Sequence, residues 1–159
     1  MKALIVYDSV FGNTEKVALA IGKALGSQEN TQTLRVSEVV PGHLSGVELL
    51  IAGSPTRGFR PTEATTKFLE SIPADGLKGM RVAAFDTRIA VKDVNNLILT
   101  VFVRLFGYAA QPIADRLTRK GGSLVIPPEG FFVKGSEGPL KEGELERAEG
   151  WARSVLQAP

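Results

Sequence analysis

Short apolar segments alternate along the chain with longer segments in which apolar residues recur at helical spacing. The first apolar run, Ala3–Tyr7, is continuous, which is typical of a strand buried on both faces of a sheet. Apolar residues then follow a helical period over 14–25, and Gly26 supplies a helix stop. The same reasoning predicts further strands at 31–36, 47–52, 81–85 and 123–126, and further helices at 62–72, 94–120 (interrupted at Gly107) and 143–156.

Strands that alternate with helices indicate right-handed crossover connections, and these connections build a parallel sheet. We therefore expect an α/β fold with a doubly wound, five-stranded parallel sheet and helices on both faces. The length of 159 residues and a hydrophobic content of 43% suit one globular domain over 1–159.

The composition narrows the chemistry. The chain has no Cys and one His, His43, so a disulfide framework, a thiolate nucleophile and a zinc or histidine-based catalytic site are not expected. The net charge of +2 argues against a nucleic-acid partner. No signal peptide or transmembrane segment is predicted, which favours a cytoplasmic protein. We expect no metal and no catalytic side chain, and we expect any chemistry to come from a bound cofactor.

The segment between the first strand and the first helix has the composition of a phosphate-binding loop. Ser9 and Thr14 offer hydroxyls, Gly12 lets the backbone approach closely, and the helix N-terminus offers unpaired N–H groups. The segment lacks the Gly-Lys-Ser/Thr ending of a Walker A loop and the glycines of a dinucleotide fingerprint. A helix capped by Asn13 or Thr14, with no ligand, is the alternative interpretation.

The same stretch resembles the phosphate loop of the flavodoxin family, position by position. The matching residues are Ile5, Val6, Tyr7, Ser9, Gly12, Thr14, Ala18 and Ile21. The resemblance implies the strand order 2-1-3-4-5, with FMN lying across the carboxyl ends of the strands. It also implies that FMN is contacted by the whole first loop: Ser9, Val10, Phe11, Gly12, Asn13 and Thr14.

Two further loops converge on the same edge of such a sheet. By resemblance, the segment after the third strand covers one face of the flavin ring, and Phe59 is its stacking candidate; the implied contacts are Ser54, Pro55, Thr56, Arg57, Gly58 and Phe59. The segment after the fourth strand would meet the other face or the pyrimidine edge through Asp86, Thr87 and Arg88. Here the chain departs from the family pattern, because 85–90 contains no Tyr, Trp or Gly. Alternatively, the segment after the third strand is a solvated surface loop that does not contact the flavin, and Asp86 is only a helix cap.

Arg57, Arg60 and Arg88 all fall in the predicted ring-facing segments. Cations close to the ring favour an anionic reduced flavin. We therefore hypothesise a less negative reduction potential than that of a low-potential flavodoxin, and the alternative is that these arginines point into water.

The segment Leu97–Phe106 is apolar on nearly all sides of a predicted helix, so we expect it to be buried. Burial within the monomer or between copies in a homo-oligomer is the favoured interpretation, and a docking surface for a quinone or a protein partner is the alternative. His43 is expected at the surface, and Trp151 in the core.

Together these features predict an FMN-binding electron carrier that works between redox partner proteins. The alternatives are a small FMN-dependent reductase that passes electrons from NAD(P)H to a quinone or similar acceptor, and a flavodoxin-like module that has lost its flavin.

Overall fold

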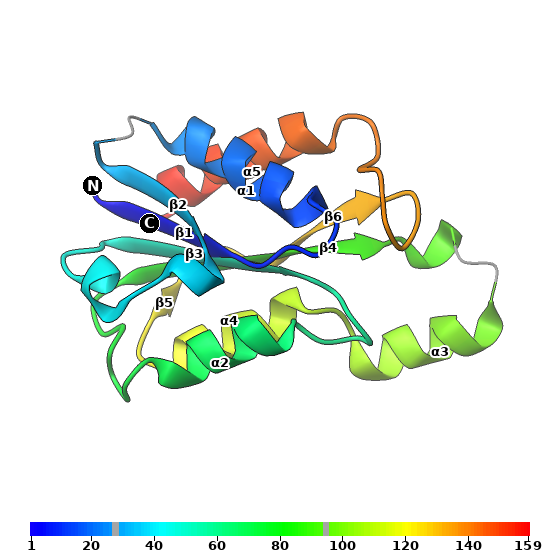
Figure 1. Ribbon diagram of the computed structural model, residues 1–159, viewed down its shortest axis with the longest axis horizontal. Coiled ribbons are helices and arrows are strands. Elements are labelled where there is room, and N and C mark those ends of the chain that lie inside the picture. Colours follow the sequence, from blue (N-terminus) through cyan, green and yellow to red (C-terminus); the bar gives the residue numbers. More distant parts are fainter. Residues whose placement is uncertain (27–28, 94–95) are drawn as a thin grey trace.

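The computed structural model describes residues 1–26, 29–93 and 96–159 (Figure 1). Its strands are β1 Ala3–Tyr7, β2 Thr31–Arg35, β3 Leu49–Pro55, β4 Arg81–Ile89, β5 Ser123–Leu124 and β6 Glu129–Val133. Its helices are α1 Asn13–Leu25, α2 Glu63–Ser71, α3 Leu97–Phe106, α4 Ala110–Arg119 and α5 Glu144–Gln157, with short 3₁₀ turns η1 Val36–Glu38, η2 Pro41–Leu44 and η3 Val91–Asp93. Positions 94 and 95, which the sequence assigned to a helix, lie outside the described residues.

The strands form a parallel sheet in the order β2-β1-β3-β4-β5, which confirms the predicted order. The last predicted strand, 123–126, is wrong in its extent. β5 ends at Leu124, and β6 resumes at Glu129 to pair with Phe85–Ile89 of β4. Pro127 and Pro128 lie between the two pieces and have no N–H to donate to a ladder.

The pairing with β6 also explains a second difference. β4 was expected to end at Phe85, with 86–88 in a loop, but it runs on to Ile89. Its extra residues all pair with β6, and Asp86 and Thr87 also pair with the end of β3. The carboxyl end of β4 is therefore a rigid strand, and any site there is built partly on sheet backbone.

Apolar side chains bury both faces of the sheet. α1 and α5 cover one face, and α2 and α4 cover the other (Figure 1). β1 shows the alternation: Ile5 joins the cluster under α1 and α5, while Val6 joins the cluster over α2 and α4. Trp151 is buried as predicted and meets the rings of Phe85 and Phe131 edge-on, with centroids 6.2 and 6.1 Å away.

The sequence predicted that the helix Leu97–Phe106 is buried within the monomer or between copies; burial within the monomer is wrong for Leu97, Ile98 and Val101, and burial between copies stays a prediction. Leu97 is 81% exposed, Ile98 68% and Val101 47%. The reason is geometric: α3 extends past the end of the sheet, beyond α4, where no sheet face covers it (Figure 1). The side chains of Phe102, Leu105 and Phe106 lie outside the description. Among the described residues, no helix combines the length and the apolar character that crossing a bilayer requires.

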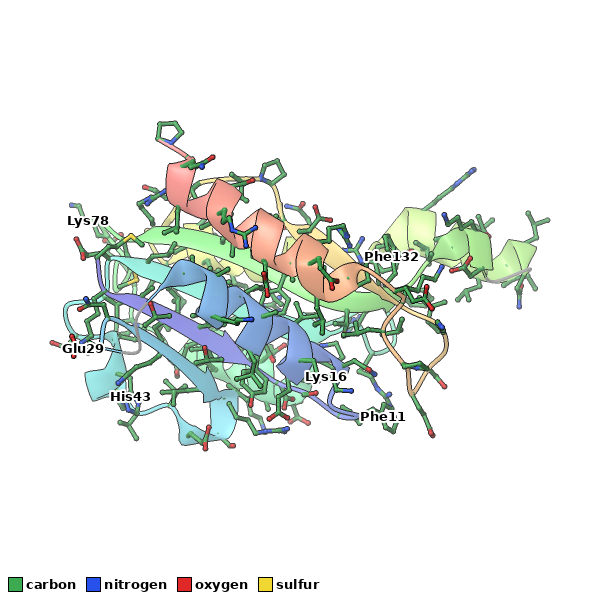
Figure 2. The ribbon with its side chains drawn as sticks, turned by 90° about the horizontal axis from the view of Figure 1, so that it is seen from above. Phe11, Lys16, Glu29, His43, Lys78 and Phe132 are labelled. Carbon is green, nitrogen blue, oxygen red and sulfur yellow. The ribbon has the colours of Figure 1, made fainter. Side chains whose placement is uncertain are left out.

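His43 lies far from the carboxyl ends of the strands. Figure 2 shows it at the opposite end of the molecule from Phe11, in the same region as Glu29. Its Nδ1 atom accepts a hydrogen bond from the Val40 N–H over 3.0 Å, so its structural role is local. The half-buried position of His43 is consistent with the predicted surface residue.

Candidate functional site

The loop between β1 and α1 turns sharply at Gly12. Gly12 has φ 88°, a left-handed conformation that favours glycine, and a Cβ added there would meet nothing within 4 Å. Its N–H donates to Ser9 Oγ over 3.0 Å. Among the described residues, no side chain caps the first turn of α1, which argues against the predicted alternative of a cap by Asn13 or Thr14. The N-terminal N–H groups of α1 are therefore left for another acceptor.

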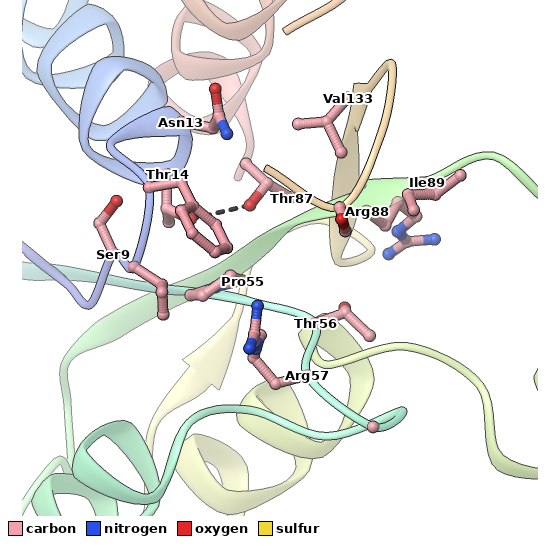
Figure 3. Close-up of a pocket in the computed structure, with 14 residues that line it drawn as sticks. Ser9, Asn13, Thr14, Pro55, Thr56, Arg57, Thr87, Arg88, Ile89 and Val133 are labelled. Atoms are coloured by element: carbon pink, nitrogen blue, oxygen red, sulfur yellow. Dashed lines mark hydrogen bonds between the residues drawn. The ribbon is translucent and has the colours of Figure 1, made fainter. Parts of the chain in front are cut away.

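Two hydroxyls meet beside this helix end. Thr14 Oγ1 and Thr87 Oγ1 are 2.8 Å apart, and both residues are buried (Figure 3). One hydroxyl donates to the other, so at least one hydroxyl proton of the pair remains for a further acceptor. The Asn13 side chain is used elsewhere: its Nδ2 donates to the Glu137 carbonyl over 3.0 Å and ties the loop after β6 to α1.

The segment after β3 is a tight turn. The N–H groups of Arg57 and Arg60 each donate to the other's carbonyl, over 2.8 and 3.0 Å. The two residues between them, Gly58 and Phe59, have φ 53° and 66°, the signature of a type I′ turn. A positive φ costs a phenylalanine about 1 kcal/mol or more. Ser54 is fully buried and accepts the Thr62 N–H over 2.9 Å, which anchors the far end of this segment.

An ion pair occupies the end of β4. Arg88 Nε donates to Asp86 Oδ1 over 2.6 Å, and Arg88 Nη2 donates to Asp86 Oδ2 over 2.7 Å. The guanidinium lies over the Tyr108 ring, 3.8 Å from its centroid. On β6, the strand that pairs with the end of β4, a Cβ at Gly130 would come within 2.2 Å of the Arg88 Nε and Cζ atoms. Only glycine at position 130 therefore leaves room for this guanidinium.

Asp86 also caps α4. Its Oδ2 accepts the Ala110 N–H over 2.8 Å, and the neighbouring Ala109 N–H donates to Thr56 Oγ1 over 3.0 Å. The alternative interpretation of Asp86 as a helix cap is thus confirmed. Burial raises the pKa of the Asp86 carboxyl above its ordinary value, while Arg88 and the Ala110 N–H act in the opposite direction.

These segments surround a cavity of about 350 Å³ at the carboxyl ends of the strands (Figure 3). Most of the residues predicted from sequence line it: Ser9, Val10, Phe11, Asn13, Thr14, Pro55, Thr56, Arg57, Gly58, Thr87 and Arg88. Four predicted residues do not line it. Gly12 forms the turn, Ser54 and Asp86 are buried behind the wall, and Phe59 faces neighbouring cavities.

Sequence reasoning missed three residues of the lining, Ile89, Val133 and Ser136. Ile89 directly follows the predicted Arg88 and belongs to the segment 85–90 that was expected to face the flavin, but it was not among the predicted contacts. Val133 ends β6, and Ser136 follows it. Recognising 129–133 as a strand would have placed the loop after it at the same edge as the other loops.

Comparison with known proteins identifies the family. The family model for flavodoxins matches residues 5–151, which is nearly the whole chain. The chain belongs to the flavodoxin family. FMN is the cofactor of this family and of this chain, and the fold is the flavodoxin electron-transfer fold.

Solved flavodoxins share the fold over their full length. Flavodoxin 2 from Bacillus cereus is 23% identical, with a TM-score of 0.77, and the match covers 99% of each chain. A flavodoxin from the domain Archaea is 22% identical, with a TM-score of 0.77, covering 99% of this chain and 97% of that one. Oxidised flavodoxin 1 from Bacillus cereus is 15% identical, with a TM-score of 0.76, and the match covers 99% of this chain and 98% of that one.

The residues at the β1–α1 loop of this flavodoxin-family chain fit a phosphate monoester. The first turn of α1 is uncapped, Gly12 leaves open space above the turn, and the Thr14–Thr87 hydroxyl pair lies beside it. The charged side chains that line the cavity, Arg57 and Arg88, come from other segments. A phosphate here is accommodated by N–H groups, hydroxyls and the helix dipole.

Proposed function

We propose that this protein is an FMN-dependent electron carrier that passes electrons between redox partner proteins. The observation that carries the proposal is the uncapped N-terminus of α1 opening on a cavity whose walls come from the segments after β1, β3, β4 and β6. FMN supplies the redox chemistry, and the protein supplies its position and its electrostatic surroundings.

In this proposal the first loop holds the phosphate. The N–H groups at the start of α1, the hydroxyl of Ser9 and one hydroxyl of the Thr14–Thr87 pair donate to its oxygens. Each hydrogen bond to a charged acceptor contributes about 1.5–3 kcal/mol, so a few of them account for specific recognition of the phosphate. Asn13 supports the site indirectly, because its side chain holds the loop after β6.

The flavin ring is proposed to lie between the Pro55–Gly58 side of the cavity and the wall that contains Ile89 and Val133. Val10 and Phe11, each about half exposed, stand at the mouth of the cavity, and Arg57 lies over the Phe11 ring, 5.5 Å from its centroid. Ser54 and Asp86 act as positioning residues, since they hold the Arg57–Arg60 turn and Arg88 without lining the cavity.

A protein partner is proposed to dock at the end of the molecule where α3 projects. Leu97, Ile98 and Val101 expose apolar side chains there, and other residues of the same helix reach the cavity next to the flavin site. Apolar side chains exposed together on one helix favour an interaction surface. An interface between copies of this chain and a docking surface for a quinone are the other occupants that the sequence suggested for this helix.

One observation favours the reductase as a second candidate function. A groove of about 770 Å³ runs from the Arg57–Arg60 turn to Arg116 of α4. Its three arginines offer guanidinium groups of the type that binds phosphates bidentately, and a nicotinamide dinucleotide carries such phosphates. The groove shares Arg57 and Gly58 with the flavin cavity.

Anaerobic addition of NADPH or NADH to the FMN-loaded protein distinguishes the two functions. An electron carrier keeps its visible flavin absorbance for as long as no partner reductase is added. Rapid bleaching of the flavin absorbance by either nucleotide, slowed by Arg116→Gln, would favour the reductase function over the electron carrier. A purified protein that is colourless and does not take up added FMN would contradict both.

A further inference from the structure

Arg35 contacts the β1–α1 loop from a neighbouring strand. It is the last residue of β2, and the sheet register places it beside Tyr7, the last residue of β1. Its Nη1 atom donates to the Ser9 carbonyl over 2.9 Å, and its guanidinium lies over the Tyr7 ring, 5.7 Å from the centroid. Ser9 lines the flavin cavity, whereas Arg35 does not. The guanidinium therefore holds the loop without entering the cavity.

The contact with the Ser9 carbonyl orients the peptide that joins Ser9 to Val10. A trans peptide is planar, with its C=O and N–H on opposite sides, so the Val10 N–H points away from Arg35. The Ser9 and Gly12 N–H groups donate to Asp8 Oδ1 and Ser9 Oγ. The Val10 N–H has no such acceptor among the described residues, and Val10 lines the cavity. One backbone donor is thus left free at the cavity edge.

Arg35 also balances two carboxylates that flank the loop. Its Nη1 lies 3.5 Å from Asp8 Oδ1, and its Nη2 lies 3.6 Å from Glu15 Oε2. The segment 8–15 has no Lys or Arg of its own, so the compensating charge comes from β2. Without Arg35, both carboxylates would repel a phosphate dianion bound at the loop.

We propose that Arg35 is a positioning residue for the FMN phosphate. It holds the peptide after Ser9 so that the Val10 N–H is available to a phosphate oxygen, and it offsets the charges of Asp8 and Glu15. The inference rests on the proposed function, because it takes the β1–α1 loop as the phosphate site. It adds a residue from β2, a strand that contributes none of the residues lining the cavity.

The arrangement around Arg35 requires a guanidinium group. Three acceptors surround the side chain: the Ser9 carbonyl and Asp8 lie near Nη1, and Glu15 lies near Nη2. A planar guanidinium directs separate N–H groups at these acceptors. A lysine ammonium carries the same charge on a single nitrogen, so it cannot reproduce the set of contacts.

Flavin fluorescence titrations of the apoprotein with FMN and with riboflavin test the inference. The measured quantity is the riboflavin Kd divided by the FMN Kd, because a general loss of stability weakens both flavins alike. Arg35→Gln is the critical variant, and Arg35→Lys keeps the charge but removes the planar fork. The matched control is Lys16→Gln, which removes an exposed cation of α1 at the same end of the molecule as Phe11 (Figure 2).

We expect Arg35→Gln to lower this ratio about tenfold or more and Arg35→Lys to lower it about threefold or more, both by weakening FMN. Lys16→Gln is expected to change the ratio less than about twofold. A wild-type ratio in Arg35→Gln would overturn the inference. A wild-type ratio in Arg35→Lys, or equal losses in Arg35→Gln and Lys16→Gln, would also overturn it, since Arg35 would then act through its charge alone.

The NMR resonance of the Val10 amide gives a readout that a purely structural role of Arg35 would not move. Addition of FMN to the isotope-labelled apoprotein is expected to shift this amide proton downfield, as a hydrogen bond to phosphate does, and riboflavin is expected to shift it much less. The FMN-induced shift should shrink in Arg35→Gln. A Val10 resonance that responds equally to both flavins would contradict the inference.

The same titrations separate this inference from the proposed function. If the wild-type protein binds FMN no more tightly than riboflavin, the phosphate site of the proposed function fails, and the role of Arg35 fails with it. If the wild type prefers FMN and Arg35→Gln retains the whole preference, only the role of Arg35 fails and the proposed function stands.

Discussion

The Arg88 guanidinium meets the Asp86 carboxylate through two parallel hydrogen bonds of 2.6 and 2.7 Å, within one strand of the sheet. This geometry changes the electrostatic picture suggested by the sequence, in which Arg88 was a free cation beside the flavin ring. The pair is formally neutral, and it links the wall of the flavin cavity to the first turn of α4 through the Ala110 N–H. Arg57 and Arg60 are both exposed and form no ion pair with a carboxylate among the described residues, so they remain the positive groups on which that hypothesis rests.

Asp86→Asn is predicted to destabilise the fold by about 3 kcal/mol, because it leaves the Arg88 guanidinium without its buried partner. Urea unfolding followed by circular dichroism measures the change. The control is Glu63→Gln, which breaks an exposed pair with Lys67 and is expected to leave the midpoint unchanged. An equal midpoint for Asp86→Asn and wild type would show that the pair does not contribute to stability.

Gly130→Ala is predicted to displace Arg88, since the new Cβ would lie 2.2 Å from its guanidinium atoms. Overpacking of this kind costs about 1–3 kcal/mol. The control is Gly150→Ala in the middle of α5, where a Cβ would meet nothing within 4 Å and the helix gains about 0.5–1 kcal/mol. Opposite shifts of the two thermal midpoints are expected. An unchanged or raised thermal midpoint for Gly130→Ala would mean that Arg88 moves aside without cost.

Arg57→Gln is predicted to make the flavin reduction potential more negative by about 30 mV, a threefold change in a one-electron equilibrium. The cause is the loss of a cation from the cavity wall, which disfavours added negative charge. Potentiometric titration at low salt measures the shift, and added salt is expected to shrink it. Arg153→Gln, on α5 and absent from the cavity lining, serves as the control. Identical shifts of the potential in both variants would show that the position of Arg57 at the cavity does not influence the flavin reduction potential.

Glu144→Gln is predicted to flatten the acid side of the stability profile. Burial raises the pKa of Glu144, but hydrogen bonds from Arg147 and the Phe132 N–H outweigh it and hold the pKa below the ordinary 4.5. A carboxyl of this kind stabilises the fold fully above its unfolded pKa, and the contribution is lost as pH falls through the folded value.

Urea midpoints measured from neutral pH to below 4.5 are therefore expected to fall further for wild type than for Glu144→Gln. Glu142→Gln, at an exposed neighbouring position, is expected to follow the wild type. Parallel curves for wild type and Glu144→Gln would rule out this carboxyl as the source of the acid sensitivity.

The sequence predicted the strands β1, β3 and β4 because their apolar runs are continuous and well bounded, and the resemblance to the flavodoxin family implied the sheet order. It predicted the phosphate loop because Ser9, Gly12 and Thr14 stand together between a strand and a helix. These are local signals, and the structure contains the corresponding elements at nearly the predicted positions.

What the sequence did not predict depends on how segments pair and on where they lie in the fold. The extension of β4 requires β6, which the Pro127-Pro128 pair separates from β5. The neutralisation of Arg88 requires Asp86 two residues earlier on the same face of a strand, where a loop was expected. The exposure of α3 depends on where the chain leaves the sheet, and hydrophobicity alone does not reveal that.

The most direct test of the central claim compares FMN with riboflavin, which has the same ring and ribityl chain but no phosphate. We predict that flavin fluorescence titrations of the apoprotein give an FMN dissociation constant about a hundredfold or more below that of riboflavin, as two charge-assisted hydrogen bonds imply. Thr87→Val should narrow this difference, while Thr118→Val on α4 should not. Equal affinity for the two flavins would contradict the assignment of the β1–α1 loop as the phosphate site.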